Sequence, residues 1–265
     1  MAVPDIHYDV YGQGRPAIFV HGSFGWGVDT FPEQRTLADL VRVVLIDRRG
    51  FGQSRDIQSD GWPGDLRDLL DVVTRLGPAH LVGHSYGAIV TLLAAAARPH
   101  LVLSLVTVEP PMFTLATDDS DAQRIVEDAA HVYAHASGMQ VDEFVAAFGA
   151  AVLGRKPQAT RKRTATWTDM DWAAADATRR ARWPGDASVN WSQLRDTTFP
   201  KLSVGGGWPA ESGYPHRVGR AFRAVVESVA ARTGGEVVVF DRSTHNPQVE
   251  QSTEFNEMLR RLYST

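Results

Sequence analysis

Short runs of apolar residues recur along the first 110 positions, separated by longer stretches with helical composition or apolar spacing. Each run is apolar nearly throughout, which indicates strands buried on both faces. Strands that alternate with helices in this way are typical of a mostly parallel sheet covered by helices. The predicted strands cover residues 17–20, 41–46, 80–82 and 103–108, and the predicted helices cover 31–40, 66–76 and 88–97.

The pattern changes between residues 112 and 195, where helical segments dominate and no convincing central strand is found. Helices are predicted there over 126–136 and 141–153, strands resume at 201–204 and 237–240, and a last helix covers 248–262. A helical stretch in the middle of a strand–helix pattern indicates an insertion. We therefore predict an α/β core domain made of residues 1–111 and 196–265, with residues 112–195 inserted as a helical cap.

Composition limits the classes of function. With 265 residues, of which 43% are hydrophobic and 22% charged, the chain has globular proportions. The absence of cysteine excludes disulfides, thiolate metal sites and a cysteine nucleophile. A formal charge of −4 gives no general attraction to phosphate, so a small, neutral molecule is a better expectation for a partner than nucleic acid.

The N-terminal residues show no basic region followed by an apolar run, and no apolar span reaches 18 residues. The sequence therefore predicts a cytoplasmic protein with no membrane partner, and it leaves a homodimer open.

The strongest chemical signal is Gly83-His84-Ser85-Tyr86-Gly87, between a predicted strand and an alanine-rich helix. That context is the one a nucleophile elbow requires, because small residues on either side leave room for a strained central residue. The turn would raise the Ser85 hydroxyl above the sheet. It would also place the Tyr86 amide at a helix N-terminus, where N–H groups favour developing negative charge.

A second donor to an oxyanion is expected from the loop His21-Gly22-Ser23-Phe24-Gly25, which follows an earlier strand. The Ser23 amide is the preferred donor and the Phe24 amide is the adjacent alternative. A plain glycine-rich connection is the other interpretation of this loop.

These motifs make the chain resemble the α/β-hydrolase superfamily over nearly its whole length. The resemblance rests on residues 21–25 (HGSFG), 47–54 (DRRGFGQS) and 83–87 (GHSYG). It implies the α/β-hydrolase fold and a serine nucleophile. The second motif looks like an architectural turn of the family, and we assign it no catalytic role.

Serine needs a base, and in this family the chain order is serine, acid, histidine. His245 lies after the strand at 237–240 and before the last helix, where the superfamily keeps its base. His131 and His135 stand four apart on a predicted helix, a spacing that can bind metal. No third ligand is evident, so we interpret them as a solvated helix face and predict no metal and no cofactor.

Two residues are candidates for the acid. The loop after the strand at 201–204 contains no aspartate, so the chain departs from the common family pattern. Glu109 follows the strand at 103–108, and its position resembles the acid site after the family's sixth strand in haloalkane dehalogenases and zearalenone-type lactone hydrolases. Glu211 lies in the usual loop but beyond a proline. Glu109 is preferred, Glu211 is the alternative, and a serine–histidine dyad stays open.

The predicted cap is rich in aromatic residues, some of which belong to its core while others face the nucleophile. Trp183 is the preferred pocket residue in the cap, and Phe24 is expected to touch substrate from the oxyanion loop. The basic run 155–163 is interpreted as solvated surface, with an anion site as the alternative.

Together these features predict a serine hydrolase that cleaves a carboxylic ester or lactone of a bulky hydrophobic or aromatic compound, with a zearalenone-like lactone as one candidate. Two alternatives remain. One is a carbon–carbon bond hydrolase or perhydrolase-type enzyme with the same residues, and the other is a binding protein that keeps the fold without turnover.

Overall fold

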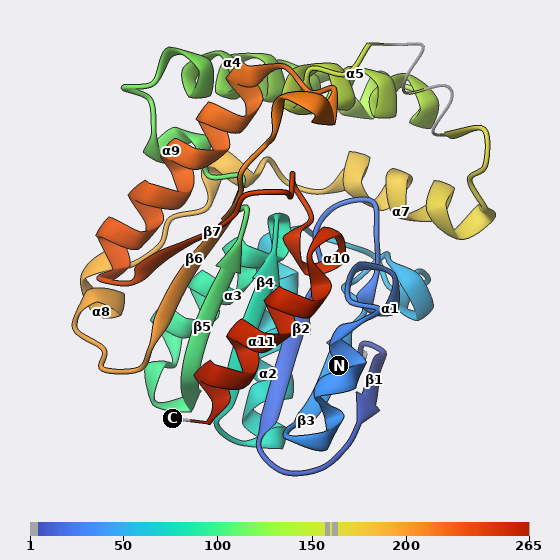
Figure 1. Cartoon of the computed structure of the whole chain (residues 1–265). Coiled ribbons are helices and arrows are strands. Elements are labelled where there is room, and N and C mark those ends of the chain that lie inside the picture. The colour runs from blue at the N-terminus through green and yellow to red at the C-terminus, as the bar shows by residue number, and fades with distance from the viewer. Residues whose placement is uncertain (1–4, 157–159, 161–163, 265) are drawn as a thin grey trace.

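The computed structural model describes residues 5–156, 160 and 164–264. Seven strands form one sheet in the order β1-β3-β2-β4-β5-β6-β7 (Figure 1). Strand β1 is antiparallel to β3, and all other neighbours are parallel, which confirms the predicted sheet type. The strands are β1 (Tyr8–Tyr11), β2 (Pro16–Val20), β3 (Arg42–Ile46), β4 (Ala79–His84), β5 (Val102–Val108), β6 (Lys201–Gly206) and β7 (Glu236–Phe240).

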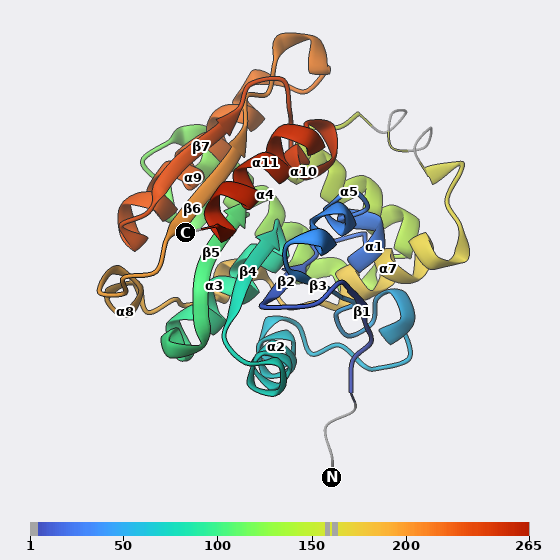
Figure 2. The same cartoon turned by 60° about the horizontal axis from the view of Figure 1, so that its bottom comes forward.

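Helices cover both faces of the sheet, which explains why the strands are apolar at successive positions. Ile18 and Leu81 face one hydrophobic core together with Phe222, whereas Phe19 faces a second core together with Leu259. In Figures 1 and 2, α11 lies on one side of the sheet and α2 and α3 lie on the other. The helices outside the β5–β6 segment are α1 (Gly27–Thr30), α2 (Trp62–Leu76), α3 (Tyr86–Ala97), α9 (His216–Thr233), α10 (Pro247–Glu250) and α11 (Ser252–Tyr263).

The segment between β5 and β6 contains α4 (Ser120–His135), α5 (Val141–Leu153), α7 (Asp169–Arg180) and α8 (Trp191–Arg195), and no strand among its described residues. Helices α4, α5 and α7 lie beyond the carboxyl ends of the parallel strands (Figure 1). This is the region predicted to form a cap, and its treatment as a separate unit stays a prediction.

Two predicted helices differ in the structure. The helix expected over 31–40 is wrong, because only the 3₁₀ helix η1 (Gln34–Asp39) forms there. Phe31 precedes a proline, and that position disfavours helical backbone. The expected last helix is divided at Gln251, whose side-chain oxygen accepts hydrogen bonds from the Arg242 amide and the Ser243 hydroxyl. Strand β1 and helix α9 were not foreseen, whereas α7 lies in the segment that was predicted to be helical but was not given a range of its own.

None of the helices in the described ranges combines the length and the apolar character needed to cross a bilayer.

Candidate active site

Ser85 stands at the sharp turn between β4 and α3, with φ of 52° and ψ of −123°. A positive φ is strained for a residue with a side chain, and such strain concentrates at functional sites. Close approach of the backbone requires both neighbouring glycines. A Cβ at Gly87 would overlap the Val20 carbonyl oxygen, and one at Gly83 would overlap the Thr91 hydroxyl. The local sequence therefore specifies this turn, because Gly83 and Gly87 have no side chain that would block it.

Ser85, His245 and Glu109 form a row of hydrogen-bonded side chains. The distance from Ser85 Oγ to His245 Nε2 is 3.1 Å, and His245 Nδ1 lies 3.3 Å from Glu109 Oε2. The second carboxylate oxygen of Glu109 accepts a bond from the Gly206 amide at 2.7 Å and faces the Trp208 indole N–H at 3.4 Å. The carboxylate is fully buried and is held from two sides.

The loop after β6 was considered as the source of the acid, but in the structure it supplies hydrogen-bond donors to the acid. Glu211, the alternative acid, lies exposed in the 3₁₀ helix η7 (Ala210–Ser212), whereas His245 Nδ1 faces Glu109. The same loop supplies the Gly206 and Trp208 donors to Glu109. Neither donor was foreseen, and the only local signal was a tryptophan directly after three glycines at a strand end.

Burial shifts the titration of both members of the His245–Glu109 pair. It lowers the pKa of His245 to about 4, and the Arg155 charge acts in the same direction while Glu250 opposes it. Burial raises the pKa of Glu109 to about 8, against the opposing effect of the Gly206 and Trp208 N–H groups. Burial therefore disfavours the charged form of each group taken alone, which holds His245 neutral and able to accept a proton, and ionisation of both groups together is favoured by their mutual attraction. An imidazolium formed there would be stabilised mainly by the adjacent carboxylate.

Two backbone amides adjoin Ser85 without a protein acceptor among the described residues: those of Tyr86, the first residue of α3, and of Ser23 in the loop after β2. The Phe24 amide, the alternative donor, instead donates to the Thr178 hydroxyl at 3.2 Å. This leaves Ser23 and Tyr86 free to bind an oxyanion.

Arg48 fixes the loop that carries Ser23. Its guanidinium donates to the His21 carbonyl at 3.1 Å and to the Gly22 carbonyl at 2.8 Å, and it is paired with Asp65 at 2.8 Å. The Gly22 carbonyl belongs to the same peptide unit as the Ser23 N–H, so these bonds restrain the direction of that N–H. Sequence reasoning assigned the 47–54 motif to architecture and did not foresee this contact.

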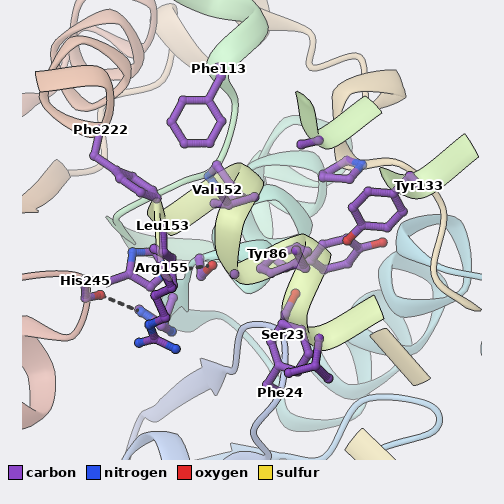
Figure 3. Close-up of a pocket in the computed structure, with 18 of the residues that line it drawn as sticks. Ser23, Phe24, Tyr86, Phe113, Tyr133, Val152, Leu153, Arg155, Phe222 and His245 are labelled. Carbon is purple, nitrogen blue, oxygen red and sulfur yellow. Dashed lines mark hydrogen bonds between the residues drawn. The ribbon is translucent and has the colours of Figure 1, made fainter. Parts of the chain in front are cut away.

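Ser85 lines a cleft that is partly open to solvent, and other residues of the cleft wall are labelled in Figure 3. Both predicted contact residues, Phe24 and Trp183, line it. The Trp183 ring packs 5.3 Å from the ring of Tyr133, which also lines the cleft. The other apolar wall residues include Phe113, Val145, Phe148, Val152, Leu153 and Phe222.

Arg155, the first residue of the basic run, also lines the cleft. Residues 157–159 and 161–163 of that run lie outside the described residues.

His131 and His135 are exposed on α4, with ring centroids 4.3 Å apart. Within the described ranges no group of three metal-ligating side chains is found there or elsewhere.

Comparisons with known proteins agree with this architecture. The model of the alpha/beta hydrolase family matches residues 17–258. The chain is 30% identical over 102 residues to the (E)-2-((N-methylformamido)methylene)succinate hydrolase of Acinetobacter baylyi, covering 36% of this chain and 38% of that protein. It is 34% identical over 120 residues to the pimeloyl-(acyl-carrier protein) methyl ester esterase of Shewanella woodyi, covering 43% and 44%. The matches therefore span less than half the length of these relatives.

A solved alpha/beta hydrolase from Sphaerobacter thermophilus shares the fold, with a TM-score of 0.68 at 22% identity over 96% of each chain. Because the family model extends from the first parallel strand to the last helix, this chain belongs to the alpha/beta hydrolase family.

Proposed function

We propose that this chain is a serine hydrolase that cleaves a carboxylic ester or lactone through an acyl-enzyme. The observation that carries the proposal is the row from Ser85 Oγ to His245 Nε2 and from His245 Nδ1 to Glu109, which lies beneath the cleft. A nucleophile bonded to a base, and a base oriented by a carboxylate, is the arrangement that acyl transfer requires.

In the first half of the reaction, His245 Nε2 takes the Ser85 proton as Oγ attacks the carbonyl carbon. The oxyanion of the tetrahedral intermediate accepts bonds from the Ser23 and Tyr86 amides, each contributing roughly 3 kcal/mol in the transition state. Glu109 stabilises the imidazolium. His245 then protonates the leaving alcohol, and the carbon–oxygen bond breaks.

In the second half, water attacks the acyl-enzyme with His245 as base. The second tetrahedral intermediate releases the acid and returns the proton to Ser85. For a lactone the alcohol and acid belong to one product. No cofactor or metal takes part in these steps.

The cleft supports a bulky hydrophobic or aromatic substrate. Phe148, Trp183 and Phe222 present apolar ring surface, and Phe24 adds a further ring from within the oxyanion loop. Apolar walls around a few fixed polar groups are typical of sites for small organic molecules. The name of the Shewanella woodyi relative, a methyl ester esterase, supports an ester as the reacting group.

The proposal is tested by intact-mass measurement after treatment with a fluorophosphonate, which reports an activated serine without knowledge of the substrate. We expect one adduct on the wild-type protein and none on Ser85→Ala. Aryl esters and macrocyclic lactones then define the reacting bond. Folded wild-type protein that forms no adduct would contradict the proposal and favour a binding protein. Cleavage of diketones without ester hydrolysis would favour a carbon–carbon bond hydrolase.

A further inference from the structure

The walls of the cleft contain one permanently charged side chain. Among the described residues that line it there is no aspartate, glutamate or lysine, and Arg155 is the only arginine. Helix α5 ends at Leu153, and the left-handed backbone of Gly154 (φ 59°) then turns the chain so that Arg155 follows at the cleft wall. Figure 3 shows the Arg155 side chain on the side of the cleft where His245 lies.

Arg155 has no carboxylate partner within the described ranges. Its Nη2 donates to the Tyr214 hydroxyl at 2.6 Å, and its guanidinium carbon lies 5.5 Å from the Tyr214 ring centroid. In contrast, the buried Arg48 and Arg49 each form an ion pair with an aspartate. Residues 156–163 contain no aspartate or glutamate that could neutralise Arg155.

A second guanidinium lies close to the same turn. A Cβ on Gly154 would be 3.5 Å from Nη2 of Arg217 on α9, and Arg217 Nη1 is buried with no acceptor among the described residues. The turn after α5 is therefore a cationic region beside an apolar cleft. A half-buried cation without a counter-charge is costly in the empty protein and is stabilised by an anion that enters the cleft.

The chemistry of guanidinium indicates which anion fits. Arg155 has five N–H donors in a planar fork, and the hydroxyl of Tyr214 occupies one nitrogen. The remaining edge can hold a carboxylate through two parallel bonds. Resting on the proposed ester hydrolysis, we propose that Arg155 binds a carboxylate on the substrate, so that the enzyme prefers an anionic ester with an apolar body to its neutral counterpart.

The test compares two pairs of esters in which a carboxylate replaces a methyl group. Monomethyl terephthalate and methyl 4-methylbenzoate place the difference on the acyl side, whereas 4-acetoxybenzoate and 4-methylphenyl acetate place it on the alcohol side. In at least one pair we expect kcat/KM of the wild-type protein to favour the anionic ester about tenfold to a hundredfold, the range of a charge-assisted bond. The pair that shows the preference identifies the side of the ester that carries the charge.

Arg155→Met should abolish the preference through KM, Arg155→Lys should keep part of it, and Lys156→Met, at the exposed neighbouring position, should keep all of it. The ratio within a pair cancels any general effect of the variant on His245. Equal losses for both esters in Arg155→Met, or a wild-type preference for the neutral ester in both pairs, would overturn the inference. Failure of the proposed function would look different, since neither hydrolysis of any ester nor a fluorophosphonate adduct would then be seen.

Discussion

Replacing Glu109 by glutamine tests the hydrogen-bonded row at the atom that orients the imidazole. The Gly206 and Trp208 N–H groups both point at Oε1, so the carbonyl oxygen of the new amide must stay there. Its NH₂ group then faces His245 Nδ1, where Oε2 lies in the wild-type protein. An N–H donor at this position requires Nδ1 to accept, which moves the ring proton to Nε2. An Nε2 that carries a proton cannot take one from Ser85.

The expected loss in kcat is about ten-thousandfold. This is the loss seen when the carboxylate of a catalytic triad is replaced by the amide of the same shape. Converted to an activation barrier, this is about 5.4 kcal/mol. The folded state should not suffer, because a neutral amide at this fully buried position avoids the desolvation that raises the Glu109 pKa. Thermal unfolding should therefore give a Tm equal to or above that of the wild-type protein.

The assay is hydrolysis of an aryl ester together with the rate of fluorophosphonate labelling, and Glu211→Gln is the matched control. We expect the control to stay within about twofold of wild type, because a solvent-exposed carboxylate away from the imidazole has little influence on it. A Glu109→Gln protein within tenfold of wild-type kcat, or a Glu211→Gln protein reduced a hundredfold, would refute the reasoning.

Two further predictions concern buried polar groups. Arg48→Met should lower kcat roughly tenfold to a hundredfold with little change in KM, because the peptide that carries the Ser23 N–H loses its restraint; complete loss of an oxyanion donor costs a hundredfold or more. Steady-state kinetics on folded protein check this result. Burial lowers the pKa of His80 to about 4, so the unfolded chain takes up a proton below pH 6.5 that the folded chain resists. Stability is therefore present above pH 6.5 and is lost as the pH falls, by about 2 kcal/mol per such histidine between pH 7 and 5. In urea unfolding, His80→Gln should reduce the pH dependence by that amount.

Arg49→Met is the matched control for Arg48→Met. Arg49→Met breaks a comparably buried ion pair with Asp68 but touches no part of the loop that holds Ser23. It should lower stability like Arg48→Met while leaving kcat of the folded enzyme unchanged; equal kinetic losses in both variants would contradict a specific effect of Arg48. For His80, an unchanged pH dependence in the glutamine variant would show that the proton is taken up elsewhere.

The sequence predicted best what depends on neighbours along the chain. The strands could be read as apolar runs because both faces of the sheet are covered, and the elbow around Ser85 is specified by its own glycines. Strand β1 was not predicted, because it is a partly exposed edge strand and Asp9 interrupts its apolar pattern. Gln251 divides the last helix through bonds to a preceding turn, which no helical pattern reveals.

In the active site, the contacts that the sequence could not predict join segments that lie far apart along the chain. His245 has a local context, but Glu109 meets it across 136 positions, because the loop after β7 passes over the end of β6, which lies between β5 and β7 in the sheet. Trp208 reaches Glu109 across 99 positions, and Arg48 reaches Gly22 across 26. Sequence patterns supply candidates for such partners, but only the fold selects among them.

Four residues with side chains have left-handed φ values in the described chain: Phe24 at 63°, Ser85 at 52°, Glu109 at 48° and Trp208 at 50°. They follow β2, β4, β5 and β6, four adjacent strands of the sheet, at the same edge. Each costs about 1–3 kcal/mol, so their sum is comparable with the net stability of a typical protein. Glycine at any of them would relax the backbone. At Ser85, where glycine removes only a hydroxymethyl group, a screen for heat resistance that ignores activity would therefore enrich variants that gain melting temperature and lose the nucleophile. Stabilising substitutions that keep activity should therefore leave these four positions unchanged and be sought at the opposite end of the sheet.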